Sequence, residues 1–201
     1  KEDIPKIQNT LGLIIFTIFI VAGNIANFLI EDEENKTKIR ILSSGISKWK
    51  YYFSLVFVFY IMSFLTIFVY YLMCKIFSIN FGMENSVDFL IVMIFLNLLA
   101  LSFNLCIVSF TRSRYTSTIV NILIIVPCCM LSGVFWNFNV MTGNFQRIGR
   151  FMPTRWVILS VETLQRTNNL QSISTYLYSL TLLSIVFFVI TFIKLRRNKE
   201  I

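Results

Sequence analysis

The residue types that most often carry chemistry are sparse in this chain of 201 residues, and their spacing excludes the common catalytic sites. The sequence has no histidine, and its four cysteines form no C-x-x-C pair, which argues against a metal site and against a thiol oxidoreductase. No glycine is followed by lysine, so the chain has no P-loop for ATP phosphates. The cysteines are Cys74, Cys106, Cys128 and Cys129, and we expect the adjacent pair to be small packing residues. We therefore expect neither an enzyme nor a bound cofactor.

The polar side chains inside the long apolar segments are amides rather than acids. No Asp or Glu lies in the middle of such a segment, whereas proton-coupled transporters keep ionisable residues there as a relay. Asn24 and Asn27 lie one turn apart in the first segment, and Asn97 and Asn104 lie two turns apart in the third. Because amides in hydrocarbon need partners, we expect them to join helices or to line a polar path. Pro127 in the fourth segment predicts a kink or a local opening.

The elements that position these residues are predicted from five apolar blocks. The chain is 56% hydrophobic and only 14% charged, with a mean hydropathy of +0.73, whereas soluble domains are about 25% charged. Each block is long enough to cross about 30 Å of hydrocarbon at ~1.5 Å per residue. We predict spans at 11–30, 52–77, 89–110, 118–136 and 176–193, within one transmembrane domain covering residues 1–201. The predicted fold class is an all-α polytopic membrane helix bundle.

The basic residues predict which ends of the spans face the cytoplasm. The formal net charge is +8, but Lys and Arg lie mostly at the edges of apolar blocks, which indicates membrane topology rather than nucleic-acid binding. With the C-terminus inside, the cytoplasmic segments hold Lys36, Lys38, Arg40, Lys48, Lys50, Arg112, Arg114, Lys194, Arg196, Arg197 and Lys199. Basic residues concentrate on the inner side. We therefore expect a multi-pass protein of the cytoplasmic membrane with a cytoplasmic C-terminus.

The charged connector at residues 31–50, which we name the coupling segment, links the first two predicted spans on that inner side. Asp32 and Glu34 precede Lys36 and Lys38 by four residues, a spacing that stabilises an exposed helix. An apolar edge follows, and Gly45 offers a turn before the next span. From the residues alone, a solvated connector and an attachment site for a partner subunit are equally well supported.

The segment 137–174 has mixed polar and apolar residues and is expected on the outer side. Phe145, Ile148 and Met152 recur at helical spacing, and a second such series begins at Trp156, after Pro153. Two short amphipathic helices joined at Pro153 fit this pattern, lying at or partly entering the outer leaflet. An ordinary folded extracellular loop is the alternative.

An ordered motif spans the end of the fourth predicted span and the outer segment, in the stretch MLSGVFWNFNVMTGNFQRIGRFMPTRW. Its members are Leu131, Ser132, Gly133, Phe135 and Trp136, followed by Phe151, Pro153 and Trp156. In order and spacing, the motif resembles the LSG.fW and F.P..W elements of ABC-2-type transporter permeases. Within that family, the sequence of this motif is similar to that of bacterial antibiotic-resistance exporters of the linearmycin-resistance type.

The resemblance implies roles for both connectors. In ABC-2 permeases, a segment like 31–50 forms a coupling helix that seats in a groove of the ATPase subunit, and a segment like 137–174 forms a re-entrant helical hairpin that guards the outer end of the path. The counterparts of the coupling residues are Glu31, Glu33, Glu34, Thr37, Arg40, Ile41, Leu42, Ser43 and Ser47. The residues expected to line the path or the outer gate are Asn24, Asn27, Asn97, Asn104, Pro127, Gly133, Phe135, Trp136, Phe151, Pro153 and Trp156. Because complete ABC-2 permeases have six spans, we also expect a further span ahead of Lys1.

These features predict a permease subunit of an ATP-binding cassette exporter that moves an amphipathic or lipophilic cargo, such as an antibiotic, a peptide or a lipid-linked molecule. A second permease chain, identical or different, would complete the path within the lipid bilayer, and a homodimer or heterodimer of ATPase subunits would drive it. No nucleic-acid partner is expected. The alternative is a non-transporting membrane immunity or sensor protein that binds a toxic peptide at its outer face.

Overall fold

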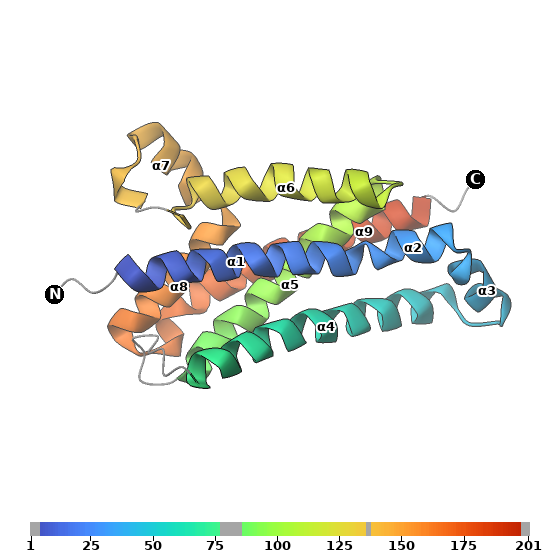
Figure 1. Cartoon of the computed structure of the whole chain (residues 1–201), viewed down its shortest axis with the longest axis horizontal. Helices are drawn as coiled ribbons and strands as arrows, with labels where there is room; N and C mark the ends of the chain where they lie inside the picture. The colour runs from blue at the N-terminus through green and yellow to red at the C-terminus, as the bar shows by residue number, and fades with distance from the viewer. Residues whose placement is uncertain (1–4, 77–85, 136–137, 198–201) are drawn as a thin grey trace.

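The computed structural model describes residues 5–76, 86–135 and 138–197, and these residues are helical over almost their whole length, with no strand among them. Figure 1 shows long helices lying side by side, with short helices at both ends of the bundle. The elements in order are α1 (Pro5–Ala26), α2 (Phe28–Glu34), α3 (Thr37–Ser43), α4 (Lys48–Ile76), α5 (Ser86–Phe110), α6 (Arg114–Leu131), η1 (Phe138–Val140), α7 (Gly143–Arg150), α8 (Pro153–Thr167), η2 (Leu170–Ile173) and α9 (Ser174–Arg197).

Five helical segments of the described chain are long and apolar enough to cross a membrane: Leu11–Glu34, Trp49–Ile76, Val87–Phe110, Arg114–Leu131 and Leu170–Leu195. The prediction of an all-α bundle with five spans is therefore confirmed. The fourth span differs from its predicted bounds of 118–136, because its helix begins at Arg114 and ends at Leu131. Residue 77, the predicted end of the second span, and Trp136 lie outside the described residues.

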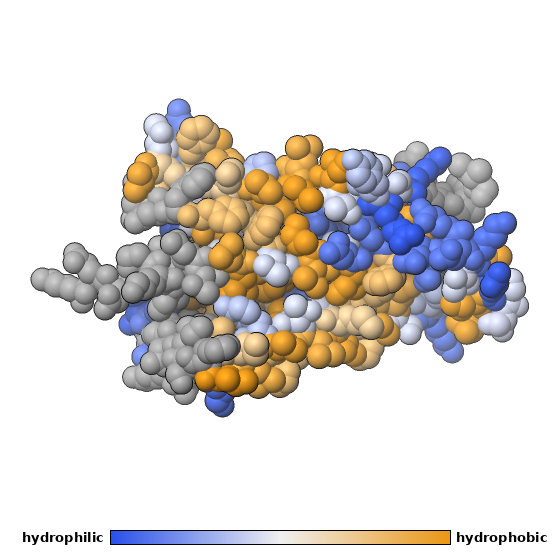
Figure 2. Space-filling model, viewed as in Figure 1, coloured by the Kyte–Doolittle hydropathy of each residue, from blue (hydrophilic) through white to orange (hydrophobic). Residues whose placement is uncertain are grey.

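α5 forms the centre of the bundle and packs against α1, α4, α6, α8 and α9. Its side chains are apolar around the whole circumference, which is the pattern of a helix that is buried on all sides. Val92, Met93, Leu96 and Ala100, for example, are fully buried. α4 and α9 instead leave long rows of large apolar residues exposed, among them Phe53 on α4. Figure 2 shows a hydrophobic band over the middle of the molecule, which includes α4, and a hydrophilic surface at the end that holds α3.

The two ends of the bundle hold different elements (Figure 1). The turn from α2 to α3, the start of α6 and the end of α9 lie together at one end, which we name the α3 end. α7 and α8 lie at the other end. The coupling segment and the connector between α5 and α6, which contains Arg112, therefore share one end of the structure. The distribution of basic residues in the sequence predicts the same side of the membrane for both.

Candidate functional site

The coupling segment folds as two short helices rather than as one exposed helix. α2 continues the first span to Glu34, and Lys36 then adopts the left-handed conformation with a φ of 56° before α3 begins at Thr37. Because this turn breaks the helix, the predicted pairs of Asp32 with Lys36 and of Glu34 with Lys38 are not among the ion pairs of the described residues. The prediction of i,i+4 pairs was therefore wrong.

The acidic side chains of the coupling segment bind other parts of the same chain. Lys38 forms an ion pair with Glu33 across the turn, and the Tyr51 hydroxyl donates a hydrogen bond to Asp32 Oδ2 at 2.8 Å. Partial burial lowers the pKa of Lys38, but the Glu33 carboxylate and the Tyr52 phenol outweigh this effect, so its pKa is raised. α2, α3 and the start of α4 are thereby tied into one structural unit.

The outer surface of this unit is apolar and basic. Ile39 is 61% exposed and Trp49 is 62% exposed, with the exposed Arg40 and Ile46 between them in the sequence. Trp49 also stacks on Phe192 of α9, with 4.3 Å between the ring centroids. Of the remaining predicted coupling residues, Thr37, Ile41 and Leu42 are half-buried, and Ser43 and Ser47 are exposed. Large apolar side chains exposed at a charged end are typical of a protein-binding surface.

Arg114, the first residue of α6, binds two carboxylates of α2. Its Nη1 lies 3.1 Å from Glu31 Oε2 and its Nη2 lies 3.4 Å from Glu34 Oε2. We name Arg114, Glu31 and Glu34 the Arg114 triad. One turn along α6, Thr118 Oγ1 accepts a hydrogen bond from Asn27 Nδ2 at 3.0 Å. The triad and this bond join the first span to α6 at the α3 end.

Further into the bundle, α1 approaches α5 and α6 closely at Gly23. A Cβ at this position would overlap with the Asn121 amide and lie 2.9 Å from Asn104 Oδ1. Asn104 Nδ2 donates to the carbonyl oxygen of Phe19 on α1 at 3.1 Å, and Asn97 Nδ2 donates to that of Tyr60 on α4 at 3.3 Å. The predicted amides of α5 therefore join helices within this chain.

The two asparagines predicted in the first span, Asn24 of α1 and Asn27 at the N-cap of α2, have opposite environments although they lie one turn apart. Asn27 is buried at 7% exposure, whereas Asn24 is exposed, on the same face as the exposed Thr17. The buried Asn27 Oδ1, Asn97 Oδ1 and Asn121 Oδ1 accept no hydrogen bond from the described residues. An unpaired buried acceptor costs roughly 1–3 kcal/mol, so these three carbonyls are the least satisfied polar groups described within the bundle.

The Leu131–Ser132–Gly133 motif is the C-terminal cap of α6. Gly133 has a φ of 81°, the Val134 N–H donates to the Cys129 carbonyl at 3.2 Å, and the Gly133 N–H donates to the Met130 carbonyl at 3.5 Å. This is the Schellman arrangement, in which glycine supplies the left-handed residue after the helix. Pro127 lies inside α6, which continues through it as one helix.

The Phe151, Pro153 and Trp156 motif connects α7 to α8. Pro153 is the first residue of α8, where its missing N–H is tolerated. Trp156 Nε1 donates to the Arg150 carbonyl at 3.1 Å, which satisfies an acceptor at the end of α7. Phe151 is 79% exposed. The prediction of two short helices joined at Pro153 is confirmed for α7 and α8.

α8 packs its apolar face into the bundle, while α7 lies over the end of α6. Val157, Ile158, Val161 and Leu164 of α8 are buried. Between η1 and α8, the Arg155 guanidinium lies over the Phe138 ring at 4.1 Å from its centroid, and within α8 it pairs with Glu162 at 3.8 Å. Burial lowers the pKa of Arg155. The contacts of Phe138 and Arg155 fix η1 against α8.

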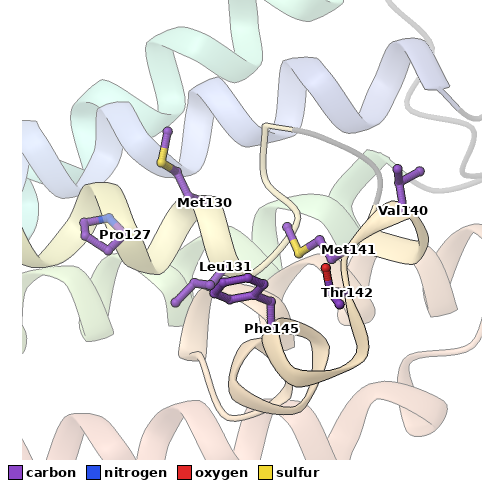
Figure 3. A pocket seen from close by; sticks show the side chains of 7 residues that line it. All are labelled: Pro127, Met130, Leu131, Val140, Met141, Thr142 and Phe145. Carbon is purple, nitrogen blue, oxygen red and sulfur yellow. The ribbon is translucent and has the colours of Figure 1, made fainter.

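A groove of about 650 Å³ lies between the end of α6 and the η1–α7 segment, and we name it the α6–α7 groove. Figure 3 shows Phe145 lying over Leu131, with Met130 and Pro127 further along α6. The residues that line the α6–α7 groove are Pro127, Met130, Leu131, Val140, Met141, Thr142 and Phe145. Among them, Pro127 was expected from the sequence to lie at the path or gate.

The structure does not bring the predicted path and gate residues into one site. Asn24 and Asn27 lie towards the α3 end, Asn97 and Asn104 are in the core, and Gly133, Phe151, Pro153 and Trp156 surround the opposite end. Phe135 is half-buried and contacts Phe16 edge-on with 5.8 Å between centroids. Trp136 lies outside the described residues.

Sequence reasoning missed the partners of two polar residues on α6. It used Arg114 only as evidence for topology, and it did not consider Asn121. Arg114 contacts Glu31 of α2, and Asn121 lies against Gly23 of α1, so the partners of both residues are distant in the sequence. The available signal for Asn121 was an amide within an apolar segment, the same signal that identified Asn97 and Asn104.

Comparison with known proteins gives one family. The family model described as ABC-2 family transporter protein matches residues 7–193. No curated protein and no solved structure matches the chain at a significant level.

Proposed function

This chain belongs to the ABC-2 family of transporter proteins, and from that premise we propose that it is the permease of an exporter driven by a separate ATPase subunit. Family membership makes it a multi-pass membrane component of an ABC transporter. We further propose an amphipathic or lipophilic cargo, such as an antibiotic, a peptide or a lipid-linked molecule. The resemblance of its outer motif to antibiotic-resistance exporters supports this cargo class.

The observation that carries the proposal is the exposed surface of the coupling segment. The acidic residues of the segment bind Arg114, Lys38 and Tyr51 of the same chain, so they hold the segment in place. Ile39 and Arg40 are left exposed on α3, at the end where the basic connectors gather. We propose that this face of α3 contacts the ATPase subunit, while the Arg114 triad transmits the movement of α3 to α6.

A second permease chain, identical or different, would enclose the path. α1 lies between α4 and α6 in Figure 1, and Thr17 and Asn24 are exposed on one of its faces. A smaller groove of about 240 Å³ follows this face between α1 and α4. An exposed amide within an apolar span needs a polar partner, and a path completed by another permease chain would provide it.

The proposal is tested by replacing Ile39 with glutamate. The tagged chain, expressed in its native cells and affinity-purified, should co-purify a protein with a P-loop. Ile39→Glu should reduce the amount of that protein at least tenfold, because a carboxylate replaces an apolar side chain at the contact. Val87→Glu is the matched control, since Val87 is also 61% exposed but lies at the opposite end of the bundle.

Equal recovery of the P-loop protein with Ile39→Glu would contradict the proposed role of α3. Absence of any P-loop protein from the wild-type preparation would contradict the ATPase partner itself. That second result would favour the non-transporting immunity or sensor protein.

A further inference from the structure

The α6–α7 groove opens where a membrane-spanning helix ends. One wall is the last turn of α6, whose candidate span ends at Leu131, and the other wall is Val140, Met141 and Phe145. Of the seven residues that line the groove, only Thr142 carries a polar side chain. Pro127 and Met130 are exposed, so this wall faces the surroundings of the bundle. The groove is therefore open to an apolar chain at the boundary between hydrocarbon and head groups.

α7, which forms the other side of the groove, is amphipathic and basic. Phe145 and Ile148 of α7 and Phe151, which follows its last residue, recur at a spacing of three residues and are exposed at 52%, 48% and 79%. Arg147 and Arg150, in the last turn, are exposed as well. A short amphipathic helix with exposed apolar and basic residues lies along a membrane surface and attracts anionic lipids.

The sequence on either side of α7 is basic and lacks acidic residues. The sequence has no Asp or Glu between Asp88 and Glu162, and Glu162 is paired with Arg155. Neither Arg147 nor Arg150 has an acidic partner among the described residues. Two arginines about one turn apart on a helix, neither paired with a carboxylate, are suited to bind a phosphate.

The groove is held open by contacts that do not involve any ligand. Gly149 packs so closely on the end of α6 that a Cβ would overlap with the Leu131 carbonyl and the Phe138 ring. Gln146 Nε2 donates to the carbonyl oxygens of Phe138 at 3.2 Å and Met141 at 3.0 Å. These contacts fix α7 at a constant separation from α6, which reduces the ordering needed on binding.

We propose that the α6–α7 groove binds an anionic phospholipid of the surrounding membrane. One acyl chain lies against Met130, Leu131 and Phe145, and the phosphate is bound by Arg147 and Arg150. The volume of the groove lies within the ~300–1,000 Å³ of ordinary ligand sites. This site does not depend on ATP or on a partner subunit, so it is independent of the proposed export.

The test measures which lipids stay bound to the purified chain. The protein is reconstituted into vesicles of phosphatidylcholine and phosphatidylglycerol at a four-to-one ratio, extracted in mild detergent and analysed by native mass spectrometry. In the wild type, the ratio of bound phosphatidylglycerol to bound phosphatidylcholine should be at least fivefold above their ratio in the vesicles. The double variant Arg147→Gln/Arg150→Gln should lose this enrichment. Arg166→Gln, an exposed arginine in the last turn of α8, is the matched control and should keep it.

A second variant tests the acyl chain. Val140 is 83% exposed, so Val140→Asp leaves packing intact while placing a carboxylate in the groove. It should lower retention of phosphatidylglycerol at least threefold, and 10 mM inorganic phosphate should not displace the lipid from the wild type. Retention of the two lipids by the wild type in the same ratio as in the vesicles, unchanged enrichment in the arginine double variant, or displacement by phosphate alone would overturn the proposal. A lipid-free dimer that loses its partner on Val140→Asp would overturn it too, because a second copy would then occupy the groove.

Discussion

Removal of the Arg114 side-chain charge should loosen the contact between the first span and α6. Arg114 is 48% exposed, and its partners Glu31 and Glu34 are 33% and 47% exposed. Ion pairs with this exposure contribute about 0.2–1 kcal/mol each. The two pairs together should therefore contribute about 1 kcal/mol, which corresponds to about 2–4 °C in Tm for a chain of this length.

The assay is thermal unfolding of purified Arg114→Gln in detergent at low and at high salt. In 0.1 M salt the variant should unfold about 2–4 °C below the wild type. In 1 M salt the difference should fall by more than half, because the Debye length shortens from about 10 Å to about 3 Å. Arg114→Glu, which places a third carboxylate beside Glu31 and Glu34, should lower Tm further, and adding Glu31→Arg should restore part of the loss.

Arg112→Gln is the control for this experiment. Arg112 is exposed two residues earlier and makes no ion pair within the described residues, so its removal should leave Tm within about 1 °C. An equal loss in Arg112→Gln, or a loss in Arg114→Gln that 1 M salt does not reduce, would refute the reasoning from charge. The contact would then depend on packing of the long arginine side chain.

Three further predictions concern the core, the outer helices and the topology. Asn104→Ala should lower the free energy of unfolding by about 0.6–1.7 kcal/mol in an SDS titration, because it removes a hydrogen bond between membrane helices; no change would show that this bond is replaced. Gly149→Ala should cost about 1–3 kcal/mol in the same titration through overlap with the end of α6, whereas Gly143→Ala, with nothing within 4 Å of its Cβ, should be neutral. A cysteine at Asn168 should react with an impermeant maleimide on intact cells while one at Ser113 should not, and the reverse pattern would invert the proposed orientation.

The sequence by itself determined the spans, because length and apolar composition are local properties. A helix rises ~1.5 Å per residue, so an apolar block of about 20 residues fits the hydrocarbon whatever surrounds it. The helix start at Pro153 follows from local backbone chemistry in the same way, whereas α6 ends at Leu131, ahead of the predicted end at residue 136, because Gly133 forms its cap. The break at Lys36 was missed because no glycine or proline marks it.

Only the tertiary structure decided which polar residues meet. Asn24 and Asn27 carry the same side chain one turn apart, yet one is exposed and the other binds Thr118. Their difference depends on where α6 packs against α1, which no local pattern specifies. The pairing of Arg114 with carboxylates 80 and 83 residues earlier has the same cause. Helix packing brings these distant side chains together. The apolar faces of membrane-spanning helices are too uniform in sequence to show which helix faces pack against each other.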